Sequence, residues 1–200
     1  TDMNEFIQSN VELVSSKTNR VPLPVGLESQ VIKVKKLLDV GSDDVVHMVG
    51  IHGLGGTGKM TLVAVYNSIA DHFESLCFLE NVGETLNKYG LQYLQSKLLS
   101  KTVGEMDINL TSAREGIPLI QHRLQHKKVL MILDDVDKPE QLIVGRPDWF
   151  GPGSRVIITT PDKQLLIHHG VKRTYEVKEL NKEDALQLLS WKAFKFEKID

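Results

Sequence analysis

The chain has 200 residues, of which 24 are Lys or Arg and 26 are Asp or Glu, so its formal net charge is −2. A composition of 41% hydrophobic and 25% charged residues is that of a globular protein and excludes wholesale disorder, while near-neutral charge argues against a general nucleic-acid binder. The longest apolar run, Val129–Leu133, is far shorter than the roughly 18 residues of a membrane span. No basic region followed by an apolar core opens the chain, so we expect no signal peptide and a cytoplasmic location, with the nucleus as the alternative.

The first 24 residues are predicted to form an arm that precedes one domain over residues 25–200. Val21-Pro22-Leu23-Pro24 indicates an extended linker, because proline restricts the residue before it to extended backbone. The chain begins without Met and ends within a helical pattern, so we expect it to be an excerpt of a larger protein.

Helical and strand-like segments alternate after the arm. Helical periodicity is predicted over residues 31–38, 57–73, 90–103, 117–124 and 181–196, and short apolar runs predict strands over 45–51, 76–79, 129–133, 155–160 and 171–177. Short strands separated by helices are typical of an open α/β fold with a parallel sheet, here of five strands. Such sheets bind ligands at the carboxyl ends of their strands.

Three features are interpreted as structural. Cys77, the single cysteine, lies in an apolar stretch and is expected to be buried, with a reactive thiol as the alternative. The run Lys33, Lys35 and Lys36 is expected to form a solvated helix face. The pair at 168–169, two histidines before a glycine, is expected to be an exposed helix end and not a metal site.

The strongest functional signal is a glycine-rich segment that follows an apolar strand and opens a helix, Gly53-Leu54-Gly55-Gly56-Thr57-Gly58-Lys59. Glycines let the backbone fold back so that successive N–H groups point inward, and together with the positive end of the helix these amides can enclose a di- or triphosphate. Lys59 would then reach the β- and γ-phosphates as a point charge. The segment therefore predicts binding of ADP or ATP, against the alternative of a glycine-rich turn with an incidental lysine.

The phosphate loop departs from its pattern at one position. Met60 follows the lysine, where a Ser or Thr hydroxyl would bind Mg²⁺, and a thioether is a poor ligand for so hard a cation. Thr61 is next, but a step of one residue on a helix turns the side chain by about 100°, so Thr61 is expected to face elsewhere, toward the α-phosphate side. Met60 and Thr61 are therefore predicted to line the nucleotide site while Mg²⁺ binding is weakened.

A second strand end carries two carboxylates, Asp134 and Asp135, directly after the apolar run 129–133. Beside a phosphate loop, Asp134 would hold Mg²⁺ and Asp135 would orient or activate a hydrolytic water, which makes Asp135 the candidate catalytic residue. The alternative for an acidic pair after a strand is a turn or a helix cap.

Together these segments resemble the NB-ARC nucleotide-binding region of plant TIR–nucleotide-binding–leucine-rich-repeat disease-resistance proteins. The resemblance covers roughly residues 25–200 and rests on segments in the family's order: the phosphate loop at 50–61, FESLCFLENVGE at 73–84, KVLMILDDVD at 128–137, GSRVIITT at 153–160 and TYEVKELNKEDALQLLSWKAF at 174–194. The FLENV segment and Asp137 favour the TIR branch over the coiled-coil branch. The resemblance implies a P-loop NTPase-type three-layer αβα sandwich with a parallel five-stranded sheet.

The resemblance also implies a function. In this family ADP holds the resting state of a pathogen sensor, and exchange for ATP permits oligomerisation and immune signalling. The expected partners are the nucleotide, the TIR and leucine-rich-repeat domains of the same receptor and further copies of the chain, with no membrane and no direct nucleic-acid contact. Val25, in Val25-Gly26-Leu27-Glu28, resembles the segment that borders the adenine, with a linker turn as the alternative. The chain stops before the family's helical and winged-helix subdomains.

Three departures from the family bear on turnover. Pro161 replaces the arginine that senses the γ-phosphate, Gly83 stands where Arg is frequent, and Met60 removes the metal-binding hydroxyl. These changes remove groups that distinguish or hydrolyse Mg-ATP and leave the diphosphate site. We therefore expect an ADP-preferring switch module with little or no hydrolysis. The alternatives are an active ATPase, at most a slow one, a nucleotide kinase, which would need an arginine-rich lid that the sequence lacks, and an interaction scaffold without nucleotide.

Overall fold

The computed structural model describes residues 27–53, 58–104 and 108–177. Five parallel strands form one sheet in the order β2-β3-β4-β1-β5. The strands are β1 (His47–His52), β2 (Ser75–Leu79), β3 (Val129–Leu133), β4 (Arg155–Thr160) and β5 (Arg173–Glu176). The α-helices are α2 (Glu28–Leu38), α3 (Gly58–Ile69), α4 (Val82–Tyr89), α5 (Leu91–Val103), α6 (Ala113–Leu124) and α7 (Lys163–His168), and the 3-10 helices are η1 (Ala70–His72), η2 (Pro139–Gly145) and η3 (Pro147–Trp149).

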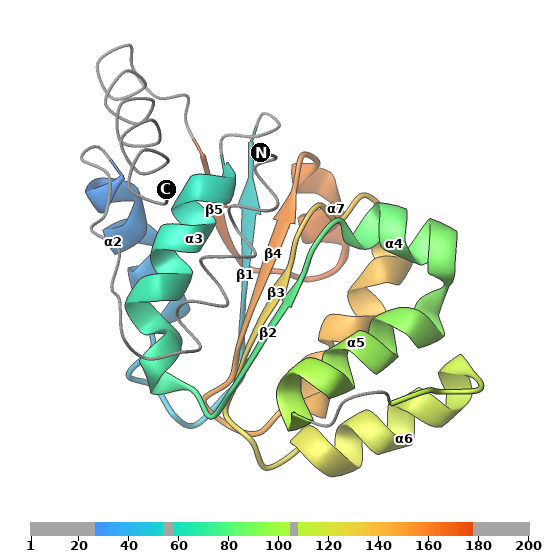
Figure 1. Ribbon diagram of the computed structural model, residues 1–200. Coiled ribbons are helices and arrows are strands. Elements are labelled where there is room, and N and C mark those ends of the chain that lie inside the picture. The colour runs from blue at the N-terminus through green and yellow to red at the C-terminus, as the bar shows by residue number, and fades with distance from the viewer. Residues whose placement is uncertain (1–26, 54–57, 105–107, 178–200) are drawn as a thin grey trace, which may run out of the picture.

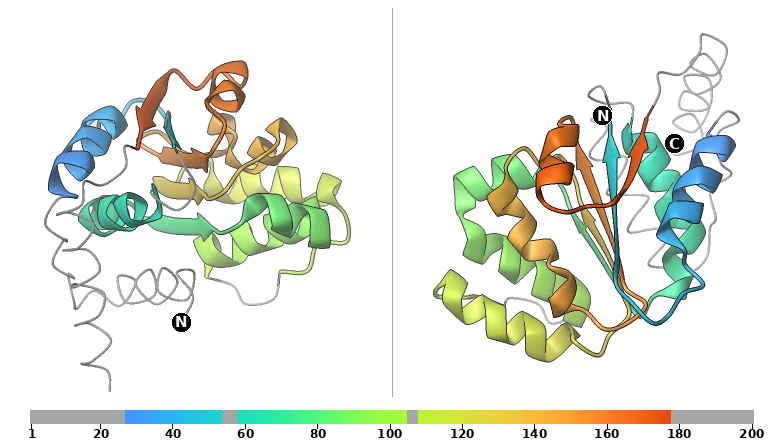
Figure 2. Two further views of the ribbon diagram at one scale, coloured as in Figure 1. Left: turned by 90° about the horizontal axis from the view of Figure 1, so that it is seen from above. Right: turned by 180° about the vertical axis from the view of Figure 1, so that it is seen from behind.

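Helices cover both faces of the sheet (Figures 1 and 2). Helices α2 and α3 pack on one face, and α4 to α7 form the layer on the other. Because successive side chains of a strand point to opposite faces, β3 contributes Val129, Met131 and Leu133 to the larger core cluster and Leu130 and Ile132 to the smaller one. The predicted three-layer sandwich with five parallel strands is confirmed.

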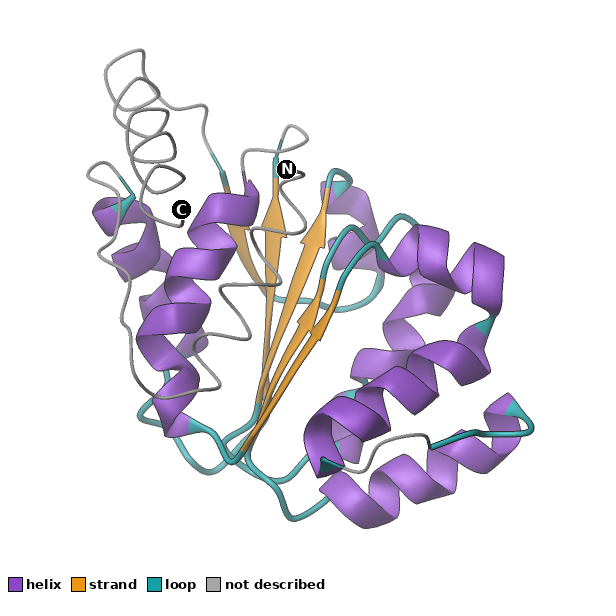
Figure 3. Ribbon diagram, viewed as in Figure 1, coloured by secondary structure: helices purple, strands orange, loops and turns teal. Residues whose placement is uncertain are grey.

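All five strands run toward the same edge of the sheet, as their arrowheads show in Figure 3. The predicted strands 129–133 and 155–160 are found with the same bounds. β1 begins two residues later than predicted, at His47, and Val45 is 51% exposed because it lies in the connection from α2. The helix predicted to reach residue 73 ends at Ile69 and continues as the short turn η1. The predicted helix over 181–196 lies outside the described residues.

Two short helices, α4 and α7, were not predicted. α4 spans only 8 residues and contains Gly83, so its helical period is hardly visible in the sequence. α7 spans 6 residues and begins after Asp162, whose carboxylate accepts a hydrogen bond from the Gln164 amide at 2.8 Å as an N-cap. α6 begins four residues earlier than predicted, because Ser112 caps it and Pro118 is accommodated within it.

The burial predicted for Cys77 and the exposed helix end predicted at residues 168–169 are confirmed. Cys77 is fully buried, and desolvation raises the pKa of its thiol to about 12, which keeps it protonated and unreactive at neutral pH. On the predicted solvated face of α2, Lys33 and Lys36 are exposed and Lys35 is half-buried. His168 and His169 are exposed at the end of α7, before Gly170, which has a φ of 76°.

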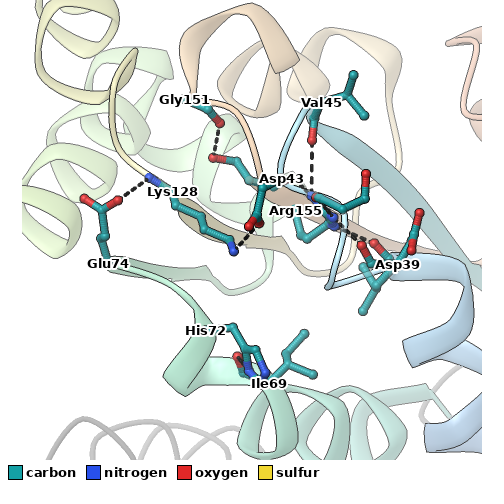
Figure 4. Close-up of polar contacts among 12 residues, drawn as sticks. Asp39, Asp43, Val45, Ile69, His72, Glu74, Lys128, Gly151 and Arg155 are labelled. Carbon is teal, nitrogen blue, oxygen red and sulfur yellow. Dashed lines mark hydrogen bonds and ion pairs between the residues drawn. The ribbon is translucent and has the colours of Figure 1, made fainter.

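A buried cation holds the opposite edge of the sheet, where the strands begin. Arg155, the first residue of β4, has no exposed surface. Its guanidinium donates hydrogen bonds to several backbone carbonyls (Figure 4). The acceptors are Leu38 and Asp39 at the end of α2, Ser42 and Val45 in the connection from α2 to β1, and the preceding residue Ser154. The last carbonyls of a helix have no partner within the helix and carry its negative pole, so a cation there satisfies both needs.

We predict that Arg155→Met lowers the free energy of unfolding by about 3 kcal/mol, because a side chain of similar length fills the space but leaves several buried carbonyls without donors. Urea unfolding followed by circular dichroism measures the change. Arg146→Met is the control, since Arg146 is exposed and its ion pair with Asp148, at 3.0 Å, is expected to contribute less than about 1 kcal/mol. Equal losses in the two variants would contradict this role of Arg155.

Candidate functional site

The order of the strands brings the predicted site segments to one edge. β4 lies between β1 and β3, and its register places Thr160 beside His52 of β1 and Ile158 beside Leu133 of β3. The phosphate loop follows β1 and the acidic pair follows β3, so both begin at the carboxyl edge on either side of the end of β4. This is the edge at which open α/β sheets bind their ligands.

The phosphate loop connects a strand to a helix as predicted. β1 ends at His52 and α3 begins at Gly58, so residues 53–57 join them and Lys59 and Met60 lie in the first turn of α3. The positive pole of α3 therefore stands at the end of the loop. Leu54, Gly55, Gly56 and Thr57 lie outside the described residues, and their contacts with phosphate stay a prediction.

Gly53 is required by packing as well as by its position in the loop. Its φ is 157°, and a Cβ built there would lie 2.8 Å from the carbonyl oxygen of Val177. The Val177 amide in turn donates to the carbonyl of His52 at 2.8 Å, so the chain that continues β5 lies against the start of the phosphate loop. Burial, and secondarily the charge of Lys163, lower the pKa of His52, which favours a neutral imidazole at this point.

Thr61 does not face open solvent in this structure. The side chain is fully buried, and its hydroxyl donates to Oε1 of Gln30 on α2 at 2.7 Å. A hydroxyl has a single hydrogen, so the same group cannot donate to a phosphate at the same time. Phosphate contact by Thr61 stays a prediction and would require the Gln30 amide to turn and donate instead. Val25, the candidate beside the adenine, lies outside the described residues.

Asp134 is held in one orientation at the end of β3. The residue is 1% exposed, and its Oδ1 accepts a hydrogen bond from the Thr159 hydroxyl at 2.6 Å. Its backbone is fixed as well, because the amide donates to Leu79 and the carbonyl accepts from Val82, both at 2.9 Å. A carboxylate that accepts one hydrogen bond and projects from a fixed backbone is suited to bind one ligand in a defined place.

Asp135 differs from Asp134 in exposure and in backbone conformation. It is exposed and has a left-handed backbone with φ of 58°, which few residues other than glycine and Asn or Asp adopt readily. Its amide donates to the Thr159 hydroxyl at 2.9 Å, so one hydroxyl joins both members of the acidic pair. The candidate catalytic role of Asp135 stays a prediction. The position of Thr159 near the end of a predicted strand is visible in the sequence, but its place beside Asp134 is not, so Thr159 was missed.

Asp134 and Met60 bear on whether this edge of the sheet can also bind a metal ion. Asp134 offers a carboxylate oxygen, whereas Met60 offers no oxygen ligand for Mg²⁺. Across the described residues, no three His, Cys, Asp or Glu side chains gather into a group able to hold a metal ion. Asp134 is therefore the residue that would bind Mg²⁺ together with the phosphates, and weakened Mg²⁺ binding stays a prediction.

The two other departures from the family lie near this edge. Gly83 is buried in the first turn of α4, and a Cβ there would lie 2.7 Å from Oδ1 of Asp137. Asp137 is held in turn by Gln141, whose side-chain amide donates to the same Oδ1. A side chain at position 83 would therefore press on the segment that follows the acidic pair. Pro161 is exposed immediately after β4.

Comparison with known proteins decides the family. The family model described as NB-ARC domain matches residues 27–198. The chain belongs to the NB-ARC domain family. It is 42% identical over 174 residues to disease resistance protein RUN1 of Vitis rotundifolia, covering 85% of this chain and 13% of that protein. It is 35% identical over 205 residues to TMV resistance protein N of Nicotiana glutinosa, covering 95% of this chain and 17% of that protein.

The NB-ARC chain thus spans less than a fifth of the length of these relatives, and its predicted kinship with plant resistance proteins is confirmed. A solved structure, Cdc6p from Pyrobaculum aerophilum, is similar with a TM-score of 0.61 and 16% identity, over 92% of this chain and 53% of that one. At this identity the likeness supports the fold alone.

The domain boundary near residue 25 stays a prediction. In the parts of the chain that the structure describes, no helix combines the length and apolar character needed to cross a bilayer.

We predict that Thr159→Val lowers the free energy of unfolding by about 2 kcal/mol, because valine keeps the shape of the side chain but removes the donor to Asp134 and the acceptor for the Asp135 amide. Thr159→Ser keeps the hydroxyl and is expected to stay within about 1 kcal/mol of the parent. Urea unfolding of the three proteins measures both values. A valine variant as stable as the parent would show that the bridge contributes nothing.

Proposed function

We propose that this chain is the ADP-preferring nucleotide-binding switch module of a plant intracellular immune receptor of the TIR branch, with little or no hydrolysis. The observation that carries the proposal is the meeting, at one edge of the sheet, of the phosphate-loop helix and the acidic strand end on either side of β4. The names of two relatives, disease resistance protein RUN1 and TMV resistance protein N, support a role in disease resistance.

The diphosphate would be bound by the loop and the helix that follows it. Amides between Gly53 and Lys59 supply donors, the first turn of α3 supplies the positive pole, and Lys59 supplies a full charge. None of these groups depends on a metal ion, so the module can hold ADP without one. The same groups would hold ATP, in which Lys59 would also reach the γ-phosphate, but Pro161 supplies no charge to bind that third phosphate.

Slow or absent turnover follows from the groups that are missing. Phosphoryl transfer depends mainly on stabilising charge around the transferred phosphate by metal and cations. Met60 supplies no hydroxyl for the metal, and Pro161 supplies no charge at the position where the family resemblance implies an arginine. Slow hydrolysis is the second candidate function, and it is favoured by the exposed carboxylate of Asp135 beside the fixed carboxylate of Asp134.

The partners that we propose are other domains of the same receptor. In a receptor several times longer than this chain, the module would contact the TIR and leucine-rich-repeat domains, and exchange of the nucleotide would change those contacts or allow self-association. The proposed location is the cytoplasm or the nucleus, with no membrane and no direct nucleic-acid contact.

We predict that the protein binds ADP and that Lys59→Ala abolishes this binding, because the charge that faces the terminal phosphates is lost. Titration of a fluorescent ADP analogue measures the affinity. Lys33→Ala is the matched control, since Lys33 is exposed on α2, and it is expected to bind like the parent. Unchanged affinity in Lys59→Ala would remove the basis for assigning residues 53–59 as a phosphate loop.

We predict that removing Mg²⁺ with EDTA changes ADP affinity less than about twofold in the parent, whereas Met60→Thr makes affinity depend on Mg²⁺, because a hydroxyl then completes the metal's ligands. The same titration, with and without EDTA, measures both effects. A large loss of ADP affinity in the parent on adding EDTA would contradict the weakened metal site.

A further inference from the structure

Helix α5 has one buried face and one exposed face. The buried face packs into the larger core cluster with side chains such as Leu94 and Leu98. The exposed face carries Tyr93, Lys97 and Lys101, each four residues after the one before. Residues four apart on a helix are neighbours on its surface, so these three side chains form one row along α5.

A groove of about 440 Å³ runs beside this row. Its other wall is the segment at residues 108–110, which precedes α6, the helix that packs beside α5 (Figure 1). The Leu110 amide donates to Oγ of Ser96 on α5 at 3.5 Å, so the wall is tied to the helix. Ile108 and Leu110 also pack against the larger core cluster, which gives this wall a fixed apolar surface.

Two tyrosine rings lie together where α4 meets α5. The centroids of Tyr89, the last residue of α4, and Tyr93 are 4.7 Å apart, with the rings tilted by 35°. Nζ of Lys88 and Nζ of Lys97 each lie 5.0 Å from the centroid of one ring, in cation–π contacts. The tyrosines are still 49% and 36% exposed. Aromatic side chains that are exposed and already ordered lose little freedom when a partner covers them, which favours binding.

The groove carries positive charge that no neighbouring carboxylate balances. Lys97 and Lys101 line it, and none of the described residues that line it is acidic. Within the ranges that the structure describes, neither lysine forms an ion pair. Glu115, which follows the apolar wall, is occupied elsewhere, because its carboxylate accepts from the amide and the hydroxyl of Thr111 at 3.0 and 2.8 Å. Charge complementarity therefore favours an acidic partner.

The spacing of the row matches an extended peptide. Lys97 and Lys101 are one helical turn apart, which is about 6 Å along the axis of α5, and Tyr93 precedes Lys97 by the same distance. In an extended chain, every second side chain points to the same side, and such side chains are about 6.6 Å apart. Two acidic residues at alternate positions would therefore face the two lysines, with an apolar residue two positions away over the tyrosine rings.

We propose that the groove between the exposed face of α5 and residues 108–110 is a docking site for an acidic peptide segment of a partner protein. The segment binds in extended form, with acidic side chains on Lys97 and Lys101 and an apolar side chain on the rings of Tyr89 and Tyr93. A nucleic acid is a poorer match, because two lysines beside an apolar wall form only a short positive patch in a chain of net charge −2. The groove shares no residue with the proposed nucleotide site, so this docking site does not depend on the proposed function.

Two peptides of equal composition test the spacing. The probe is fluorescein-labelled Gly-Leu-Ser-Glu-Ser-Glu-Gly, and its binding to the protein is followed by fluorescence anisotropy. The control peptide, Gly-Leu-Ser-Glu-Glu-Ser-Gly, places its acidic residues next to each other, so that they point to opposite sides of an extended chain. Because only one carboxylate then faces the lysines, the control is expected to bind about threefold more weakly.

Variants of the protein locate the docking site. Lys101→Glu is expected to weaken the probe about tenfold, because an attractive pair becomes a repulsive one, whereas Lys101→Arg keeps the charge and is expected to bind like the parent. Tyr93→Ser removes an exposed ring and is expected to weaken the probe about fivefold. Lys36→Glu, the same charge reversal at an exposed position on α2, is the matched control and is expected to bind like the parent. Thermal unfolding verifies that each variant is folded.

Several results would overturn the proposed docking site. These are a parent protein that binds neither peptide, equal affinity for the two peptides, and equal losses in Lys101→Glu and Lys36→Glu, which would show only a general effect of charge. Sedimentation velocity tests the alternative occupant, and self-association of the parent that Lys101→Glu abolishes would assign the groove to a second copy of the chain. A single-stranded oligonucleotide that binds more tightly than the probe and is lost in Lys101→Glu would assign it to nucleic acid.

Discussion

The candidate site depends on β4 lying between β1 and β3. The phosphate loop and the acidic pair are far apart in the sequence, and a parallel sheet in the order β3-β4-β1 sets them on either side of the end of β4. Because Thr159 lies near the end of β4, its hydroxyl reaches the acidic pair: it donates to Asp134 and accepts from the amide of Asp135. The sheet therefore brings the two segments to one edge, and β4 orients the acidic one.

The edge of the sheet where the strands begin and the edge where they end differ in structure. At the edge where the strands begin, Arg155 is buried among carbonyls of the α2 terminus and the loop that follows, an arrangement that stabilises the fold and leaves little freedom. At the edge where they end, Asp135 is exposed with a left-handed backbone and Gly53 lies against Val177. Helix α2 connects the edges, anchored by Arg155 at one end and by Gln30 at the other.

Periodicity was enough to predict the α/β class and the parallel sheet, because β3 is a continuous apolar run and β4 has an apolar centre, both buried. The family was predicted from the resemblance of its motifs and their order. The long-range contacts that organise the site and the opposite edge of the sheet could not be predicted in this way. They join residues separated by 25 positions for Thr159 and Asp134, 31 for Thr61 and Gln30, and 117 for Arg155 and Leu38, and no local pattern encodes such pairs. Helices α4 and α7 were missed because they are too short to show a period.

The central claim is that the loop between β1 and α3 retains a diphosphate without help from a metal ion or a γ-phosphate sensor. It is tested most directly by releasing bound small molecules from freshly purified protein with acid and identifying them by mass spectrometry. The account predicts ADP in an amount close to that of the protein, with little ATP. Purified protein that carries predominantly ATP, or that carries no nucleotide and takes up none when ADP is added, would contradict it.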